Sequence, residues 1–146
     1  MTPEQNKAEW IRIAEMALSS SHHLFDNHRP KPLEIICFHT QQSAEKMLKC
    51  FLVVHNVEIP KTHDLNVLWN MCLEIDERSE NIFSSLNLLN RYSVIPRYPN
   101  ELHIEEHETE KALENADFVM DFVKSILSQH ELKTNSEESE ESEASE

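Results

Sequence analysis

The sequence of 146 residues contains no glycine. Tight β-hairpin turns need residues with positive φ, which glycine adopts at the lowest cost. A β-rich fold is therefore disfavoured, and we expect an all-α chain in which proline and polar residues end the helices. The length suits one domain with a sizeable core.

Long apolar runs and paired cysteines are also missing. The longest apolar stretches are only a few residues, so no signal peptide or membrane span is visible, and a cytoplasmic protein is expected. The three cysteines, Cys37, Cys50 and Cys72, form no CxxC pair. Their odd number and aliphatic surroundings predict reduced thiols in the core.

Basic residues are scarce, with 13 Lys and Arg against 27 Asp and Glu, and the net charge is −14. The final stretch, TNSEESEESEASE, holds six of the acids and no base, which leaves −8 on residues 1–133. We expect a folded domain over residues 1–132 and a disordered acidic tail over 133–146. The tail is interpreted as a solubilising terminus; the alternative is an acidic arm that competes with nucleic acid.

Apolar residues recur at helical spacing in five segments. Thr2, Pro3 and Gln5 match the start of a first helix, and Pro32 suits the first turn of a second. Thr62 or Asp64 can cap a third, a fourth extends to about Tyr92, and a fifth starts near His103. The second helix has an apolar stripe of Ile36, Cys37, Ala44, Leu48, Phe51 and Leu52. The predicted fold is an antiparallel up-and-down bundle of four long helices plus one shorter helix.

The segment IPRYPNELHIEEH, residues 95–107, separates the last two helices and concentrates reactive side chains. Pro96 and Pro99 push the residues before them toward extended backbone. Residues 94–100 are therefore predicted to form an ordered, non-helical connector.

Two groups of segments carry a family resemblance. FHTQQSAEKMLKCFLVVHNVEIPKTHDLNVL and YSVIPRYPNE resemble the QQ-x-x-EK-x-LK, THDL and RYP motifs of the HEPN family, over roughly residues 5–128. The resemblance implies a helical bundle, often dimeric. Its members include ribonuclease toxins of toxin–antitoxin modules, domains that accompany small nucleotidyltransferases, and nucleotide-binding modules.

The nuclease members carry an arginine and a histidine four to six residues apart, and here Arg97 and His103 are separated by YPNEL. His103 could transfer the 2′-hydroxyl proton of RNA, since histidine titrates near neutrality. Arg97 could hold the phosphate with two hydrogen bonds. Tyr92 or Tyr98 could stack on an unpaired base.

Each of these residues also has a structural interpretation. Arg97 could form an ion pair that fixes the connector, His103 could be a polar residue at a helix start, and Tyr98 could fill the core. The letters HIEEH also match the H-x-x-E-H zinc-peptidase pattern, with His103 and His107 on one helical face. That pattern lacks a third ligand, and we expect neither a metal nor an organic cofactor.

The polar residues Gln41, Glu45 and Lys49 lie mostly off the apolar stripe of the second helix. They are predicted to line a nucleotide- or RNA-binding cleft that faces the arginine connector. The alternative is a solvated or intersubunit Glu45–Lys49 pair. His63 and Asp64 of KTHDL could belong to a site, although capping by Asp64 is favoured. A local basic groove could be formed by Arg29, Lys31, Lys46, Lys49, Arg91 and Arg97.

No glycine-rich phosphate loop and no serine nucleophile elbow are present. The leading hypothesis is a homodimeric HEPN-type domain that binds nucleotide or single-stranded RNA, with a metal-independent endoribonuclease as its enzymatic form. The alternatives are a non-catalytic accessory partner of a separate small nucleotidyltransferase and a pure dimerisation module.

Overall fold

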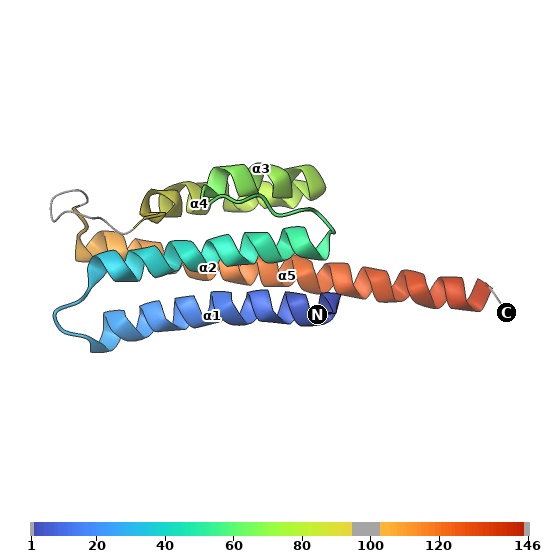
Figure 1. Cartoon of the computed structure of the whole chain (residues 1–146), viewed down its shortest axis with the longest axis horizontal. Helices are drawn as coiled ribbons and strands as arrows, with labels where there is room; N and C mark the ends of the chain where they lie inside the picture. Colours follow the sequence, from blue (N-terminus) through green and yellow to red (C-terminus); the bar gives the residue numbers. More distant parts are fainter. Residues whose placement is uncertain (1, 95–102, 145–146) are drawn as a thin grey trace.

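The computed structural model describes residues 2–94 and 103–144, and within these ranges it contains helices and no strand (Figure 1). The all-α bundle predicted from the missing glycine is confirmed. Three of the described helices are long, whereas α3 and α4 are short. The elements are α1 (Pro3–Asn27), α2 (Leu33–Val54), α3 (Leu65–Ile75), α4 (Phe83–Leu89) and α5 (Glu106–Ala144), with 3₁₀ helices η1 (Glu77–Ile82) and η2 (Asn90–Tyr92) on either side of α4.

The helix ends follow local capping rules. Thr2 accepts a hydrogen bond from the backbone N–H of Gln5, and the Gln5 side chain accepts one from the Thr2 backbone, as the sequence predicts. Asp64 caps α3 by accepting from the Asn66 backbone N–H at 2.9 Å. After α2, Asn56 has φ 59°. Asparagine tolerates this left-handed conformation better than most residues, so it can take the place that glycine often fills.

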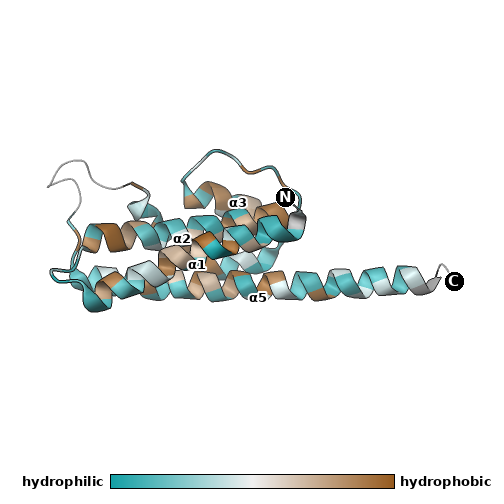
Figure 2. Cartoon of the chain, turned by 60° about the horizontal axis from the view of Figure 1, so that its bottom comes forward, coloured by the Kyte–Doolittle hydropathy of each residue, from teal (hydrophilic) through white to brown (hydrophobic). Residues whose placement is uncertain are grey.

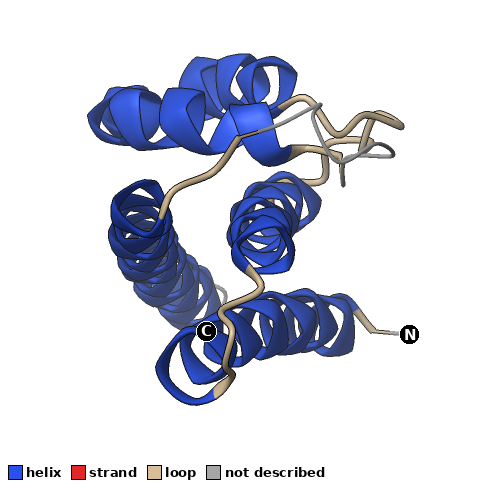
Figure 3. Ribbon diagram, turned by 90° about the vertical axis from the view of Figure 1, so that its left-hand side faces the viewer, coloured by secondary structure: helices blue, strands red, loops and turns tan. Residues whose placement is uncertain are grey.

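Helix α2 lies at the centre of the bundle and contacts α1, α3, α4 and α5 (Figure 3). Because neighbours surround it, its buried surface extends well beyond one apolar stripe. Gln41 and Glu45 are fully buried, and Lys49 is 8% exposed. The predicted stripe is buried as well, and so are the core residues Ala14, Leu65, Leu68, Leu86, Leu89, Ala112, Ala116, Val119 and Val123.

The connection between α2 and α3 departs from a simple up-and-down order. The segment after α2 turns back along the helix, so that His63 reaches Glu45 and the Cys72 thiol reaches the Leu48 carbonyl. Helix α3 therefore runs in the same direction as α2, as Figure 1 shows. Helical periodicity cannot reveal this return, because it depends on tertiary contacts of the connecting segment.

Helix α5 begins at Glu106, three residues after the predicted start, and continues through Ala144. Its last turns extend past the bundle and are mostly hydrophilic (Figure 2). The structure thus shows residues 133–144 as helix where the sequence led us to expect disorder. The stretch has no glycine or proline to end the helix, and glutamate is a good helix former.

The three cysteines are free and buried, which confirms the prediction of reduced core thiols. Burial raises the pKa of Cys37 and Cys50 to about 11 and that of Cys72 to about 12. These thiols are therefore protonated packing groups at neutral pH. Within residues 2–94 and 103–144, no helix combines the length and apolar character needed to cross a membrane.

Candidate functional site

Residues 95–102 lie outside the described part of the chain, and they include Arg97 and Tyr98. The residues that flank this segment are described. Tyr92 ends η2, and His103 precedes α5. Both residues line one hollow of about 420 Å³ at this end of the bundle. We call it the connector hollow; its other lining residues are Leu88, Arg91, Glu105, His107, Glu108 and Lys111.

Glu108 organises the wall of the connector hollow. Its carboxylate accepts a hydrogen bond from the Tyr92 hydroxyl at 2.8 Å and one from Arg91 Nη1 at 3.3 Å. Burial raises the pKa of Tyr92, and the hydrogen bond to Glu108 raises it further, so the phenol remains protonated and donates. Tyr92 is 1% exposed. In this conformation the ring therefore offers no free face for the predicted stacking on a base.

His103 and His107 both line the connector hollow and are exposed. His103 precedes the first turn of α5, because the helix begins at Glu106. His103 and His107 therefore do not lie on one face of a single helix, which is the arrangement that the zinc interpretation requires. Among the described residues, no three His, Cys, Asp or Glu side chains are placed to hold a metal ion.

Lys111 lines the connector hollow, although the sequence motifs did not single it out. His107 and Lys111 are four residues apart on α5 and therefore share a helical face that the hollow exposes. The four-residue spacing of His107 and Lys111 is visible in the sequence and would have placed Lys111 beside the histidine. Lys111 forms no ion pair within the described part of the chain, whereas Arg91 is paired with Glu108.

The predicted cleft formed by Gln41, Glu45 and Lys49 is instead a buried polar network. Glu45 Oε2 lies 3.0 Å from Lys46 Nζ and 3.3 Å from Lys49 Nζ, and Glu45 Oε1 lies 2.9 Å from His63 Nδ1. Gln41 donates to the backbone carbonyl of His63 at 3.0 Å. The network fastens the returning segment between α2 and α3 to the centre of α2.

Burial raises the pKa of the Glu45 carboxyl, but the hydrogen bonds from Lys46 and His63, together with the charges of Lys46 and Lys49, leave the pKa below its ordinary value. The network continues through Asp64, which accepts from Asn90 Nδ2 at 3.0 Å, while Asn90 Oδ1 accepts from the Leu65 backbone N–H at 2.8 Å. The QQ-x-x-EK and THDL motifs thus meet in one structural cluster, which extends to the residue that begins η2.

The predicted basic groove is largely neutralised in the described residues. Lys31 forms an ion pair with Glu106 and lies 3.9 Å from the Phe25 ring centroid. Lys46 and Lys49 share the Glu45 carboxylate. Among the described residues, the cationic and histidine side chains that line the connector hollow are Arg91, His103, His107 and Lys111.

Two solved structures share this arrangement of helices. The crystal structure of TT1696 from Thermus thermophilus matches with a TM-score of 0.69 at 21% identity, covering 82% of this chain and 96% of that one. ST0689, described as an archaeal HEPN homologue, matches with a TM-score of 0.62 at 21% identity, covering 82% and 95%. These likenesses establish the fold.

A search of curated proteins found no significant match. The HEPN domain family model, in contrast, matches residues 8–126, a range that runs from the second turn of α1 to the middle of α5. It includes both the buried Glu45 network and the connector. The chain therefore belongs to the HEPN domain family.

Proposed function

We propose that this chain is a nucleotide- or RNA-binding HEPN domain whose ligand occupies the connector hollow. The observation that carries the proposal is the gathering of Arg91, His103, His107 and Lys111 around a hollow of about 420 Å³. Tyr92 and His103 both line this hollow. In the sequence Arg97 lies between them, only a few residues from either one.

Phosphate binding in the hollow depends on cations that are free to pair. Lys111 provides one, and we assign the second to Arg97, whose guanidinium can hold a phosphate with two hydrogen bonds. Arg91 contributes less, because its guanidinium already faces Glu108. This small set of cations suits a single nucleotide or a short stretch of RNA.

In its enzymatic form the domain would be a metal-independent endoribonuclease of a toxin–antitoxin module. Neutral His103 accepts the 2′-hydroxyl proton, the 2′ oxygen forms a bond to phosphorus, and the bond from phosphorus to the 5′ oxygen breaks. The leaving 5′ oxygen takes a proton from water or from His107. Arg97 stabilises the charge that develops on the phosphorane oxygens.

The cleavage version is tested with purified protein, labelled single-stranded RNA and EDTA. Wild type is compared with His103→Ala and with His23→Ala, an exposed histidine on α1 that lies outside the connector hollow. Loss of a positioned acid–base group lowers the rate by about 10²–10⁴-fold. Equal cleavage by wild type and His103→Ala would eliminate the nuclease mechanism.

The binding version is tested by calorimetric titration with ATP and with a short oligoribonucleotide. Arg97→Ala and Lys111→Ala are expected to weaken binding at least fivefold. Lys124→Ala removes an equal charge from α5 at a position paired with Glu15, and its affinity is expected to stay within twofold of wild type. Equal losses in all three variants would show that only net charge matters.

A second candidate, a non-catalytic accessory domain for a separate small nucleotidyltransferase, rests on the acidic character of the chain. Its net charge is −14, and Glu45, Glu106 and Glu108 neutralise several of its cations. Such a surface opposes RNA binding, which draws much of its affinity from phosphate neutralisation. Co-purification with the product of the neighbouring gene, at micromolar concentration, tests this role.

Assembly is part of the proposal: the HEPN resemblance implies a bundle that is often dimeric, and we place a homodimer of this chain in the cytoplasm. Sedimentation velocity of the full chain at micromolar concentration distinguishes a dimer from a 17.1 kDa monomer. If the chain is a monomer that still binds nucleotide, the proposed binding role stands and the proposed homodimer is refuted.

A further inference from the structure

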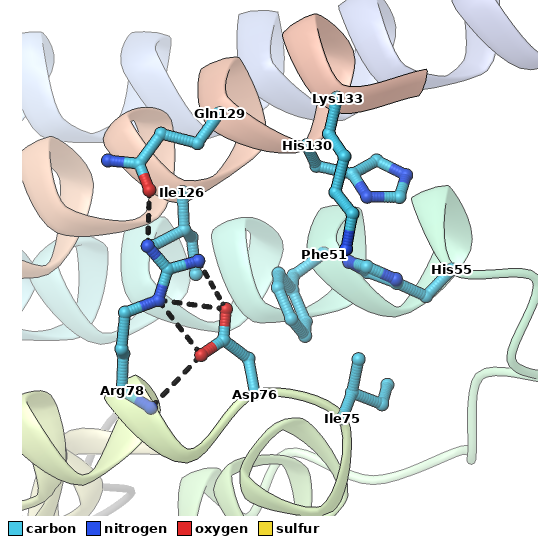
Figure 4. Close-up of a pocket in the computed structure, with 9 residues that line it drawn as sticks. All are labelled: Phe51, His55, Ile75, Asp76, Arg78, Ile126, Gln129, His130 and Lys133. Carbon is cyan, nitrogen blue, oxygen red and sulfur yellow. Dashed lines mark hydrogen bonds and ion pairs between the residues drawn. The ribbon is translucent and has the colours of Figure 1, made fainter. Parts of the chain in front are cut away.

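A second hollow is lined by residues from the end of α2, from the passage of α3 into η1 and from α5 (Figure 4). The end of α2 lies at the opposite end of the bundle from the start of α5, as Figure 1 shows. Its volume is about 410 Å³. Five charged or titratable side chains line it, contributed by the segment after α2, by η1 and its cap, and by α5: His55, Asp76, Arg78, His130 and Lys133. We call it the di-histidine hollow.

The two imidazoles lie against each other. The ring centroids of His55 and His130 are 4.4 Å apart, and the ring centroid of Phe51 lies 4.5 Å from that of His55. Burial lowers the pKa of His55 below its ordinary value, and the His130 ring lowers it further, while Asp76 opposes both effects. A negative ligand would stabilise the charged forms of both imidazoles and offset the repulsion between them.

Arg78 is held firmly at the side of the hollow. Its Nε and Nη2 atoms donate to the Asp76 carboxylate at 3.0 and 2.7 Å, and its Nη1 donates to the Gln129 side chain. The hydrogen bonds from Arg78 hold the pKa of Asp76 below its ordinary value. Asp76 is the one acidic side chain among the described lining residues, and its carboxylate is already paired with Arg78.

Lys133 completes the set. It lies three residues after His130 on α5, and Figure 4 shows its side chain extending toward His55. Its side chain is exposed, and the ion pairs formed by α5 within the described part of the chain involve other residues of the helix. Two imidazoles, one ammonium group and one guanidinium thus face one paired carboxylate, which gives a local excess of positive charge in a chain of net charge −14.

We propose that the di-histidine hollow binds a phosphate group, as inorganic phosphate or as a small phosphate monoester, between His55, His130 and Lys133. A tetrahedral dianion accepts hydrogen bonds from several converging donors, and this set offers two ring N–H groups and one ammonium. The volume also accommodates a small organic substituent beside the Phe51 ring. This site is separate from the connector hollow, so it stands independently of the proposed nucleotide or RNA function.

Binding is coupled to proton uptake. In the free protein His55 is neutral at neutral pH because its pKa is lowered, whereas a bound dianion raises that pKa and stabilises the charged ring. Each proton taken up on binding strengthens the affinity by at most about tenfold per pH unit as the pH falls. The affinity for a ligand of constant charge is therefore expected to rise between pH 8 and pH 6.

The experiment follows the Cε1–H NMR signals of the histidines in the full chain during titration with inorganic phosphate at constant ionic strength. The pH series uses sulfate, which keeps the same charge over this range. Saturable shifts of the His55 and His130 signals are expected, with Kd falling at least threefold from pH 8 to pH 6. Shifts confined to His103 and His107, or linear shifts that chloride reproduces, would overturn the proposal.

Matched variants test the assignment. His130→Asn and Lys133→Gln are expected to raise Kd at least fivefold. His22→Asn and Lys124→Gln are their controls, because both residues lie on other parts of the bundle surface and pair with Asp117 and Glu15. Lys133 is exposed, so Lys133→Gln is expected to leave the fold intact. This variant therefore tests the site even if His130→Asn lowers the stability of the protein. Unchanged affinity in Lys133→Gln, or equal weakening in the controls, would contradict the site.

Discussion

Replacement of Glu45 by alanine is the most informative perturbation of the fold. The Glu45 side chain is fully buried and faces Lys46, Lys49 and His63. Removing one partner of a buried ion pair costs about 3–5 kcal/mol, because a charge is left without compensation. Lys46 has a partly exposed side chain and can turn toward water, so we expect a value near the lower limit, about 3 kcal/mol.

The assay is urea denaturation followed by circular dichroism, with a thermal melt alongside it. A loss of about 3 kcal/mol corresponds to a decrease in Tm of roughly 6–12 °C for a chain of this size. Glu15→Ala is the matched control, since Glu15 pairs with Lys124 at 2.5 Å while both side chains are about half exposed. Its cost is expected to be about 0–1 kcal/mol. Equal losses in the two variants would refute the reasoning from burial.

The pH dependence gives a second check on the same residue. The pKa of Glu45 is below its ordinary value of 4.5 in the folded chain. Its contribution is therefore fully present above pH 4.5 and is lost as the pH falls through the folded-state pKa. Glu45→Ala should lack this part of the acid destabilisation, so the stability difference between wild type and variant should shrink as the pH falls below 4.5.

Three further predictions concern single contacts. Tyr92→Phe leaves the Glu108 carboxylate without its hydroxyl donor and should lower the free energy of unfolding by about 1–3 kcal/mol, measured by urea denaturation. Asp64→Ala removes the α3 cap and should cost about 0.5–2 kcal/mol, with smaller amide-exchange protection in the first turn of α3 as its signature. Deletion of residues 134–146 should change the free energy of unfolding by less than about 0.5 kcal/mol, because the described side chains of this stretch are exposed; a larger loss would show that the end of α5 supports the bundle.

The parts of the fold that sequence predicts well are those governed by local chemistry. Two helix starts depend only on a few adjacent residues and form as expected: the capping box of Thr2 and Gln5 at α1, and the Asp64 cap at α3. The apolar stripe of α2 also follows from periodicity alone. The direction of α3 does not, because it depends on tertiary contacts such as that between His63 and Glu45, which is 18 residues earlier in the chain.

The candidate site divides in the same way. His103 can be found from its residue type and its position in the sequence, and it does line a hollow. The roles predicted for Tyr92 and Glu45 differ from the structure because both depend on burial. A polar residue beside an apolar stripe is buried only when neighbouring elements surround the helix. Arg97 and Tyr98 lie outside the described residues, and their roles stay predictions.

The uninterrupted helix α5 gives the two hollows a shared mechanical element. Glu108 stands near its beginning and His130 lies about six turns later, a separation of roughly 33 Å along one axis. A helix hardly stretches, so α5 keeps the walls that it contributes to the two hollows at a fixed spacing. The distance between the α5 walls of the two hollows is therefore set by the helix itself and not by the loops at either end.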